Sequence, residues 1–259
     1  MSGPWTLATW NVNSIKMRAP AVAAWIDARR PDLLALQELK LTEDDFPGAE
    51  FATRNFRAAI HGQKTYNGVA FLSADALEDV AKGMPEMEDD PQARLIKARR
   101  GDVTIINVYV PNGSTVGSDK YAYKMRWLDA FARHLESRHR PDEALVVVGD
   151  FNVAPEARDI YDPVAFKDQV LFSEPERAAL GRLFDWGLVD LFRRFHEGAG
   201  LYSWWDYRAA AFRRKLGARI DLILATRALA DRALRCEIDV EPRRAEKPSD
   251  HTPVWAQFA

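Results

Sequence analysis

The sequence is poor in cysteine and carries no strong excess of charge of either sign. Cys236 is its only cysteine, so an intrachain disulfide is impossible and a thiolate metal site is not indicated. The formal net charge is −2 over 259 residues, although proteins that bind duplex nucleic acid usually carry a basic face. Charge alone therefore excludes no class of partner.

Targeting and membrane segments are also lacking. Residues 1–5 hold no basic segment followed by an apolar stretch, as a signal peptide would. No apolar run approaches the length needed to cross a bilayer. Heptad repeats typical of a coiled coil are missing as well. We therefore expect a cytoplasmic monomer that does not bind membranes.

The sequence does contain short apolar runs that alternate with helix-like segments. Continuous runs rich in β-branched residues predict buried strands over residues 5–12, 33–36, 69–72, 103–110, 145–148, 220–225 and 254–258. Helices are predicted over residues 19–29, 121–138 and 174–186, the last with Ser173 as its N-cap and Pro175 in its first turn. Because no Pro/Gly/Ser-rich linker interrupts this pattern, we predict one α/β domain over residues 1–259, layered around a central pair of sheets.

Polar side chains occur at the ends of most of these strands. The set comprises Asn11, Asn13, Gln37, Glu38, Tyr109, Asn112, Asp150, Asn152, Asp221, Asp250 and His251. Taken singly, an Asn or Asp after a strand is an ordinary turn residue. Asp221 lies inside an apolar run, however, where a carboxylate is unfavourable unless it is paired. Since strand ends of an α/β fold converge on one cleft, the set predicts a single site.

The residue types of this set indicate its chemistry. Carboxylates and amides without cysteine suit Mg²⁺ or Mn²⁺ rather than structural zinc. A histidine among carboxylates can stabilise charge or move a proton, and tyrosine and asparagine can donate hydrogen bonds to a phosphate. Phosphate-binding Gly-x-x-x-x-Gly-Lys loops, Gly-x-Ser-x-Gly elbows and Gly-x-Gly-x-x-Gly motifs are missing from the sequence. Metal-assisted attack of water on a phosphoester fits best.

Six motifs together resemble the signatures of exonuclease III-type AP endonucleases, in the same order along the chain. They are residues 9–14 (TWNVNS), 36–40 (LQELK), 109–113 (YVPNG), 149–153 (GDFNV), 219–221 (RID) and 249–251 (SDH). Residues 159–163 (DIYDP) and 202–208 (YSWWDYR) are similar to the bacterial exonuclease III branch. The resemblance covers essentially the whole chain. It implies a four-layered α/β sandwich, in which two mixed β-sheets pack face to face and are flanked by helices.

The resemblance also implies how a metal is held. Glu38 is then the principal metal ligand, with Asn11, Asn13 and Asp250 near the metal or its waters. Lys40 supports Glu38 electrostatically. The implied cofactor is Mg²⁺, with Mn²⁺ as a substitute. The residues leave the number of metal ions open.

Roles in catalysis follow from the same resemblance. Asp150 orients and deprotonates the attacking water, and Asn152 positions the phosphate beside it. His251 belongs to the cluster around the scissile phosphate together with Asp250, and Asp221 orients it and stabilises its charge. Another group in place of Asp150 as the base is an alternative that the residues leave open.

On the substrate side, Tyr109 and Asn112 are expected to contact the phosphate. Trp204 is expected to wall the pocket for a flipped-out abasic sugar, with Ile220 opposite, and a core position for Trp205 is at least as well supported. A DNA backbone is expected to pass the basic residues that follow, which are Arg208, Arg213, Arg214 and Lys215.

The expected function is that of a DNA repair nuclease acting on double-stranded DNA, especially DNA with abasic sites or blocked 3′ ends. It would hydrolyse phosphodiesters 5′ to abasic sites and act as a 3′→5′ exonuclease. One departure from the family pattern is that Ser114 and Thr115 follow Gly113, where some relatives carry a large basic residue that wedges into the duplex. The balance between endonuclease and exonuclease is therefore open.

Three alternatives remain. A DNase I-like nuclease is disfavoured by the single cysteine and the lack of a signal peptide, since such enzymes are secreted and often disulfide-bonded. A sphingomyelinase or inositol phosphatase would lack the Trp-Trp segment with its basic neighbours. A catalytically inactive DNA-binding protein is disfavoured because every expected catalytic position is filled.

Overall fold

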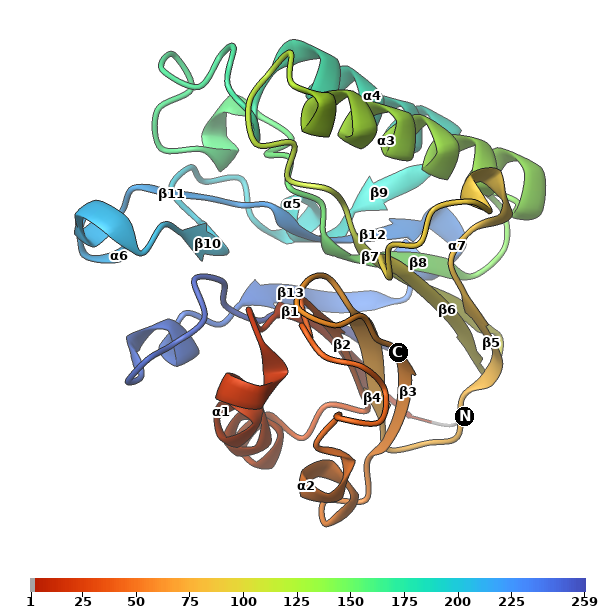
Figure 1. The fold of residues 1–259 in the computed structure, drawn as a ribbon. Helices are drawn as coiled ribbons and strands as arrows, with labels where there is room; N and C mark the ends of the chain where they lie inside the picture. Colours follow the sequence, from red (N-terminus) through yellow and green to blue (C-terminus); the bar gives the residue numbers. More distant parts are fainter. Residues whose placement is uncertain (1–2) are drawn as a thin grey trace.

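Two six-stranded β-sheets lie face to face in the computed structural model, which describes residues 3–259 (Figure 1). The first sheet contains, in spatial order, β13 (Ala233–Ile238), β14 (Val254–Phe258), β1 (Trp5–Asn11), β2 (Leu33–Gln37), β4 (Val69–Ser73) and β3 (Arg57–His61). The second contains β5 (Glu78–Lys82), β6 (Leu95–Arg100), β7 (Val103–Tyr109), β8 (Leu145–Asp150), β12 (Asp221–Thr226) and β9 (Leu188–Asp190). A separate two-stranded ribbon joins β10 (Trp204–Trp205) to β11 (Gly217–Ala218).

Both sheets are mixed. In the first, β1 pairs in parallel with β2 and antiparallel with β14. In the second, β7 pairs in parallel with β8, whereas β12 pairs antiparallel with β8. The fold class predicted from the sequence is therefore confirmed.

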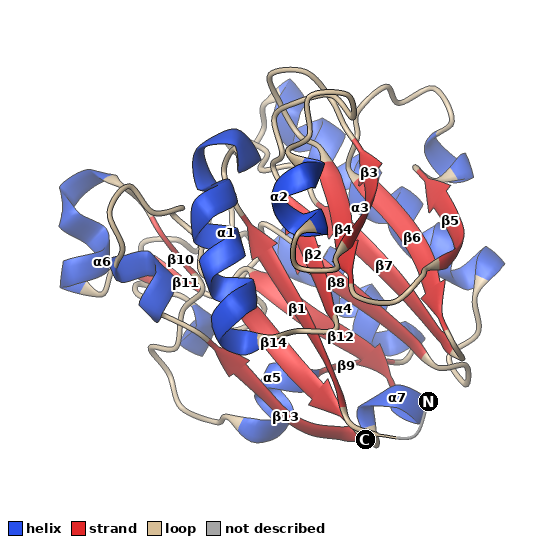
Figure 2. Cartoon of the chain, turned by 90° about the horizontal axis from the view of Figure 1, so that it is seen from below, coloured by secondary structure: helices blue, strands red, loops and turns tan. Residues whose placement is uncertain are grey.

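Helices cover the outer faces of both sheets. The helices α1 (Ile15–Arg29) and α2 (Gly48–Ala52) lie against the first sheet, and α3 (Asp119–Arg138) and α4 (Glu174–Trp186) against the second (Figures 1 and 2). Three shorter helices are α5 (Leu191–Phe195), α6 (Ala211–Arg214) and α7 (Arg227–Ala230). The layers run helix, sheet, sheet, helix, as expected. Among residues 3–259, no helix combines the length and apolar character required to span a bilayer.

The three long helices, α1, α3 and α4, lie where the sequence predicts helices, and the starts of α4 and α1 can be compared with the prediction. Ser173 forms a capping box with Glu176 at the start of α4, in agreement with the prediction. The prediction for α1 is wrong at its start. A helix over residues 19–29 was expected from the spacing of apolar residues. The helix instead begins at Ile15 and holds Pro20 in its interior.

Several strands lie outside the predicted runs because their sequences are not continuously apolar. Every residue of β5 is exposed, and β3 is exposed or half-buried along its length. Both are edge strands. An edge strand buries little side chain, so it leaves no apolar run for a sequence pattern to detect.

The core between the sheets is mainly apolar and contains a polar cluster. Leu7, Leu33, Val146 and Ile223 belong to this core and are fully buried. Gln37 reaches across it and donates to Asn107 Oδ1 at 2.7 Å and to Thr9 Oγ1 at 2.9 Å. Because these bonds join β1, β2 and β7, they fix the registers of the two sheets directly below the strand ends that carry the predicted site.

Candidate active site

The predicted polar residues meet at one edge of the two stacked sheets. Asn11 pairs with Gln37 at the ends of β1 and β2, and Tyr109 pairs with Asp150 at the ends of β7 and β8. The antiparallel strand β12 begins at the same edge, where Asp221 pairs with Asp150. Sheet register therefore brings together side chains from five strands.

Glu38 and Asp150 form the centre of the site. The amide nitrogen of Asn11 lies 2.9 Å from Glu38 Oε1 and 2.9 Å from Asp150 Oδ2. Ligand atoms of Glu38, Asp150 and His251 all lie within 4.8 Å of one another. Two carboxylates at this spacing attract a hard divalent cation, and the donor set fits Mg²⁺ or Mn²⁺.

The environment of Glu38 keeps it ionised. Burial alone would raise the pKa of Glu38, but Lys40, 2.8 Å away, and the hydrogen bond from Asn11 leave that pKa below its usual value. Tyr109 donates to Glu38 Oε1 at 2.9 Å. Burial and the charge of Glu38 raise the pKa of Tyr109 well above its usual value, so its hydroxyl stays protonated. Glu38 is therefore a charged ligand with fixed orientation.

Asp221 lies behind His251 and determines its charge. His251 Nδ1 lies 2.8 Å from Asp221 Oδ2, and Ser203 donates to the same oxygen at 2.7 Å. Although burial opposes it, the charges of Asp221 and Asp150 raise the pKa of His251 to about 10. Imidazolium has no free lone pair for a metal, so His251 serves better as a proton donor toward an anion.

Asp150 lies between this histidine and the asparagines. His251 Nε2 is 3.7 Å from Asp150 Oδ2. Burial raises the pKa of Asp150 to about 7, against the opposing charge of His251. A carboxyl group with a pKa near neutrality is matched to accepting a proton from water.

Asp250 lies at the side of this centre. Its two oxygens accept from Asn13 Nδ2 at 2.9 Å and from Trp204 Nε1 at 3.1 Å. Burial raises the pKa of Asp250, but His251 and these two donors bring it below the usual value. Asn13 Oδ1 accepts from Lys40, and Asn11 Oδ1 accepts from the backbone of Asn13. The two asparagines therefore orient the carboxylates.

Asn112 and Asn152 form the opposite side. Asn112 Nδ2 donates to Asn152 Oδ1 at 2.9 Å, and Asn152 Nδ2 lies 3.2 Å from Asp150 Oδ2 and 3.0 Å from the carbonyl of Val110. Asn152 is 4 % exposed, so its amide is held in one orientation. Asn112, which lines the cavity, therefore keeps one amide hydrogen for a ligand, and Asn152 holds it in place.

The site opens into a cavity of about 340 Å³. Trp204 and Ile220 line it, as predicted, and Leu171 adds a third apolar wall. Trp205 is 5 % exposed and packs edge-on against Phe212 at a ring distance of 4.9 Å, which agrees with a core position. One apolar wall and one polar wall suit a sugar that carries a phosphate.

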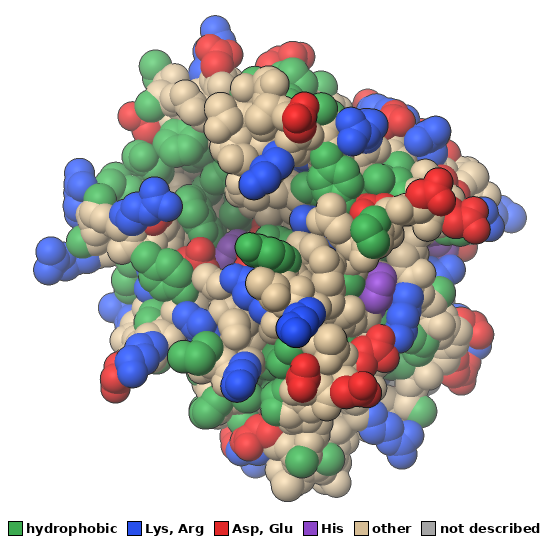
Figure 3. Space-filling view, viewed as in Figure 1, with side chains coloured by type: hydrophobic (Ala, Val, Ile, Leu, Met, Phe, Trp, Pro, Cys, Tyr) green, Lys and Arg blue, Asp and Glu red, His purple; other side chains and the backbone are tan. Residues whose placement is uncertain are grey.

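Arg208 lies at the rim of this cavity with its side chain 90 % exposed. The basic residues Arg213, Arg214 and Lys215 belong to α6 and its C-terminal end. In Figure 3, Lys and Arg side chains border the left of the molecule, where Figure 1 places α6, beside a hollow with acidic and histidine side chains at its bottom. This arrangement places positive charge next to the catalytic centre.

Backbone conformation marks several of these positions. Asn13, Glu38, Lys40, Asn152 and Leu171 all have positive φ, between 44° and 78°. Residues other than glycine adopt this region rarely, and such strain accumulates at functional sites. The sequence reveals none of this for Leu171, which lies in no motif. Its role as a pocket wall was therefore missed.

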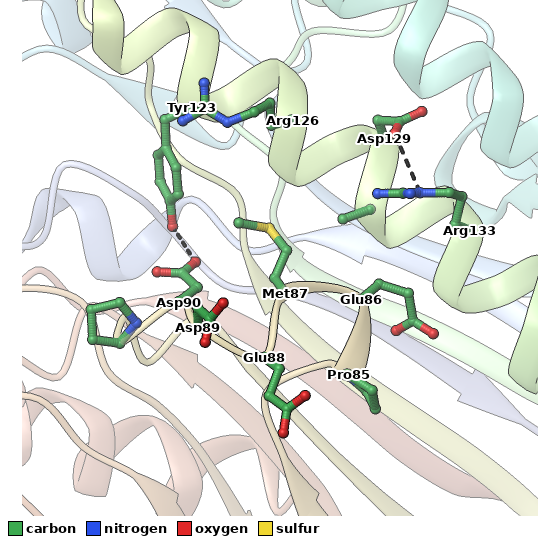
Figure 4. A pocket seen from close by; sticks show the side chains of 12 residues that line it. Pro85, Glu86, Met87, Glu88, Asp89, Asp90, Tyr123, Arg126, Asp129 and Arg133 are labelled. Carbon is green, nitrogen blue, oxygen red and sulfur yellow. Dashed lines mark hydrogen bonds and ion pairs between the residues drawn. The ribbon is translucent and has the colours of Figure 1, made fainter.

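A larger hollow of about 740 Å³ lies elsewhere, between α3 and residues 85–91 (Figure 4). Acidic residues and two arginines, Arg126 and Arg133, line it. Tyr123 closes one side by donating to Asp90 at 2.6 Å. None of the predicted site residues lines it. The smaller cavity therefore carries the chemistry.

Comparisons with known proteins agree with this geometry. Residues 8–251 match the family described as "Endonuclease/Exonuclease/phosphatase family". The chain is 34% identical to exodeoxyribonuclease III of Haemophilus influenzae over 96% of this chain and 98% of that protein. A 3′ phosphatase from Neisseria, solved bound to a product DNA hairpin, is 43% identical over 98% of this chain and 99% of that one, with a TM-score of 0.94. An AP endonuclease from Archaeoglobus fulgidus is 40% identical over 98% and 99% of the two chains, with a TM-score of 0.95.

Proposed function

This chain belongs to the endonuclease/exonuclease/phosphatase family and is a DNA repair nuclease, and we propose that it hydrolyses DNA phosphodiesters with Mg²⁺ bound at Glu38. Its substrates are duplex DNA with an abasic site, cut on the 5′ side, and duplex DNA with a free or blocked 3′ end. The observation that carries the proposal is the cluster of Glu38, Asp150 and His251, whose ligand atoms lie within 4.8 Å at the mouth of a sugar-sized cavity.

The metal would be held chiefly by the carboxylate of Glu38, because Lys40 and Asn11 keep it ionised and oriented. Asn11, Asn13 and Asp250 would lie near the metal or its waters. Asn11 orients the carboxylate of Asp150, and Asn13 orients that of Asp250. A bound divalent cation would polarise the scissile phosphate and stabilise the charge that grows on its oxygens. Oxygen ligands favour Mg²⁺, and Mn²⁺ can replace it.

Asp150 is proposed as the group that orients water and accepts its proton. Its pKa, raised by burial to about 7, allows it to be ionised before the reaction and protonated after it. The side chains of Asn11 and Asn152 donate to its Oδ2, and the backbone nitrogen of Asn152 donates to its Oδ1, so the carboxyl group has a fixed orientation. The water oxygen bonds to phosphorus as the bond to the leaving oxygen breaks.

The phosphate would be held by donors on both sides of the attacked atom. On one side, Asn112 offers the amide hydrogen that it does not donate to Asn152. Asn152 holds that amide in place, since its own amide hydrogens go to Val110 and Asp150. On the other, His251 offers a charged N–H that Asp221 holds in place. Tyr109 lines the same cavity with its hydroxyl hydrogen donated to Glu38. Donors fixed before the reaction stabilise charge that develops in the transition state.

Substrate selection is proposed to depend on the apolar part of the cavity. Trp204, Ile220 and Leu171 leave room for a sugar without a base, and a paired nucleotide is costly to unstack. Arg208 at the rim would contact a backbone phosphate of the duplex. The same cavity admits a 3′-terminal sugar, for which no flipping is needed.

Mg²⁺-dependent cleavage tests the proposal. An end-labelled duplex with one abasic-site analogue is compared with an undamaged duplex and with one that ends in a 3′-phosphate. Wild type, D150N and the matched surface control D142N, at an exposed aspartate paired with Arg140, are assayed with Mg²⁺, Mn²⁺ and EDTA. We expect incision 5′ to the lesion and release from 3′ ends, both abolished by EDTA and by D150N and retained by D142N.

Folded wild-type protein that cleaves no duplex with either metal would overturn the proposal and favour a small phosphoester as substrate. Metal-independent DNA binding without turnover would favour the inactive binding protein.

We further propose that residues 1–259 form one catalytic domain that acts as a cytoplasmic monomer. Light scattering of the purified protein tests the monomer, and a second copy in solution would contradict it.

A further inference from the structure

A buried lysine lies directly behind the phosphate side of the site. The side chains of Lys124 on α3 and Glu176 on α4 form an ion pair, and both are fully buried. Lys124 Nζ also donates to the carbonyl of Asn152 at 2.7 Å and to the carbonyl of Asn112 at 3.2 Å. An ammonium group has three donor hydrogens, so these three acceptors use all of them.

Glu176 extends the network to the apolar wall of the cavity. Its Oε1, which accepts from Lys124, also accepts from the backbone nitrogen of Leu171 at 3.2 Å. Its Oε2 accepts from the backbone and hydroxyl of Ser173 at 3.0 and 2.6 Å. One ion pair thus joins three cavity-lining residues, Asn112, Asn152 and Leu171, to the helices α3 and α4.

Stability alone does not explain a charge at this position. Burial disfavours the charged form and lowers the pKa of Lys124, against the opposing charge of Glu176. Apolar residues of similar volume commonly replace a buried ion pair without loss of stability. They cannot donate to two loop carbonyls, however, and Asn152 is held at a φ of 50°, which ordinary packing does not favour.

The lysine stem also fixes the loop that carries Asn112. Gly113 follows it with a φ of +90°, and a Cβ at that position would lie 3.1 Å from Lys124 Cδ. The loop therefore closes onto the stem, with the ammonium group beneath it. A change in the length or charge of this side chain shifts both asparagine loops together.

We propose that Lys124, paired with Glu176, is a positioning residue that sets the placement of the Asn112 amide, which contacts the phosphate, and of the Asn152 amide, which holds Asn112. The inference rests on the proposed function of those amides. Lys124 touches no substrate itself and acts only through the two carbonyls. Its removal therefore weakens phosphate binding even where the fold survives.

The test compares K124M/E176Q with E176Q and with H134Q. In the double variant, K124M keeps an unbranched side chain, and E176Q keeps an oxygen that can accept from the backbone nitrogen of Leu171. The two hydrogen bonds from Lys124 to the carbonyls of Asn112 and Asn152 are lost, and no charge is left buried at the pair. E176Q keeps the lysine and its loop bonds. H134Q changes a buried polar contact of the same helix away from the site, in which His134 Nδ1 lies 2.7 Å from Glu86 Oε2.

Two quantities are measured in all four proteins: kcat/KM on the abasic-site duplex, and the affinity for inorganic phosphate by calorimetry and by inhibition. In K124M/E176Q we expect kcat/KM to fall about 10²-fold, as for a small misplacement of catalytic groups. Phosphate affinity should weaken about tenfold, equivalent to one lost hydrogen bond. E176Q and H134Q should keep the wild-type phosphate affinity, whatever their unfolding midpoints.

A folded K124M/E176Q protein with wild-type phosphate affinity would overturn the inference. So would an equal loss in H134Q, because the effect would then follow stability alone. If K124M/E176Q does not fold, K124Q replaces it, because it removes the charge and shortens the side chain by one atom. Unchanged phosphate affinity in K124Q then contradicts the inference in the same way. Wild type that binds phosphate but cleaves no DNA would refute the proposed function while leaving the positioning test intact.

Discussion

The side-chain amide of Asn11 lies 2.9 Å from Asp150 Oδ2, although 139 positions separate the two residues in the sequence. Asn11 ends β1 in the first sheet, and Asp150 ends β8 in the second. The same nitrogen lies 2.9 Å from Glu38 Oε1. One amide thus spans the junction of the sheets and sets the spacing between the metal-binding carboxylate and the proposed base.

N11A should weaken metal binding without unfolding the protein. The substitution leaves the carboxylates of Glu38 and Asp150 without the amide donor that bridges and orients them. Loss of a group that orients a metal ligand typically weakens affinity about 10–100-fold. Titration of Mn²⁺ into wild type and N11A measures the difference, and equal dissociation constants would contradict the bridging role.

Much of this site follows from the sequence because its residues belong to motifs at strand ends. Glu38, Asp150 and His251 were predicted there, and sheet register brings them together. Lys124 was not predicted, because the sequence shows it only as one of several basic residues on a predicted amphipathic helix. Its burial depends on Glu176, 52 positions away, which only the packing of α3 on α4 brings into contact.

The pH dependence of stability should differ between wild type and D150N in the metal-free protein. The folded-state pKa of Asp150 is raised from 3.8 to about 7, so the folded state binds this proton more tightly than the unfolded state does. Stability then falls as pH rises through this window, by at most about 1.4 kcal/mol per pH unit for one proton. D150N has no such proton to lose.

Denaturant unfolding in EDTA between pH 4 and pH 8 measures this difference. Relative to wild type, D150N should gain stability steadily from pH 4 to about pH 7. D142N, at an exposed carboxylate, should show no such gain. A difference between D150N and wild type that does not change with pH would refute the raised pKa of Asp150.

R208A should weaken DNA binding and should make the affinity for DNA less dependent on salt concentration. The side chain of Arg208 is 90 % exposed beside the cavity, with the cations of α6 nearby. Removing one phosphate contact reduces the slope of log affinity against log salt by about 1. Fluorescence anisotropy of the abasic-site duplex over a salt series, in EDTA, measures the slope.

R140A is the matched control for this experiment. Arg140 is also exposed, with its side chain 76 % accessible, but it pairs with Asp142 beyond the end of α3 and does not line the cavity. The slope for R140A should equal that of wild type. Equal slopes for R208A and wild type would place the duplex away from this rim.

Leu171 is expected to control which substrate enters the cavity. It lines the apolar wall, is 5 % exposed and has a φ of 78°, a conformation that costs a non-glycine residue about 1–2 kcal/mol. L171A and L171G both remove the wall, but only glycine also relieves the backbone. L171G should therefore be the more stable of the two, by roughly 1 kcal/mol.

Both variants should raise the ratio of abasic-site incision to 3′-end release. An internal abasic sugar carries a phosphate on each side and must flip out of the duplex, so it needs more room than a terminal sugar. The ratio of kcat/KM values on the two duplexes measures this. L180A serves as control, since Leu180 of α4 is buried in the core and does not line the cavity. L180A should lose stability and keep the wild-type ratio. If L171A, L171G and L180A all keep the wild-type ratio, the cavity wall does not select the substrate. Selection would then depend on the contacts at the rim.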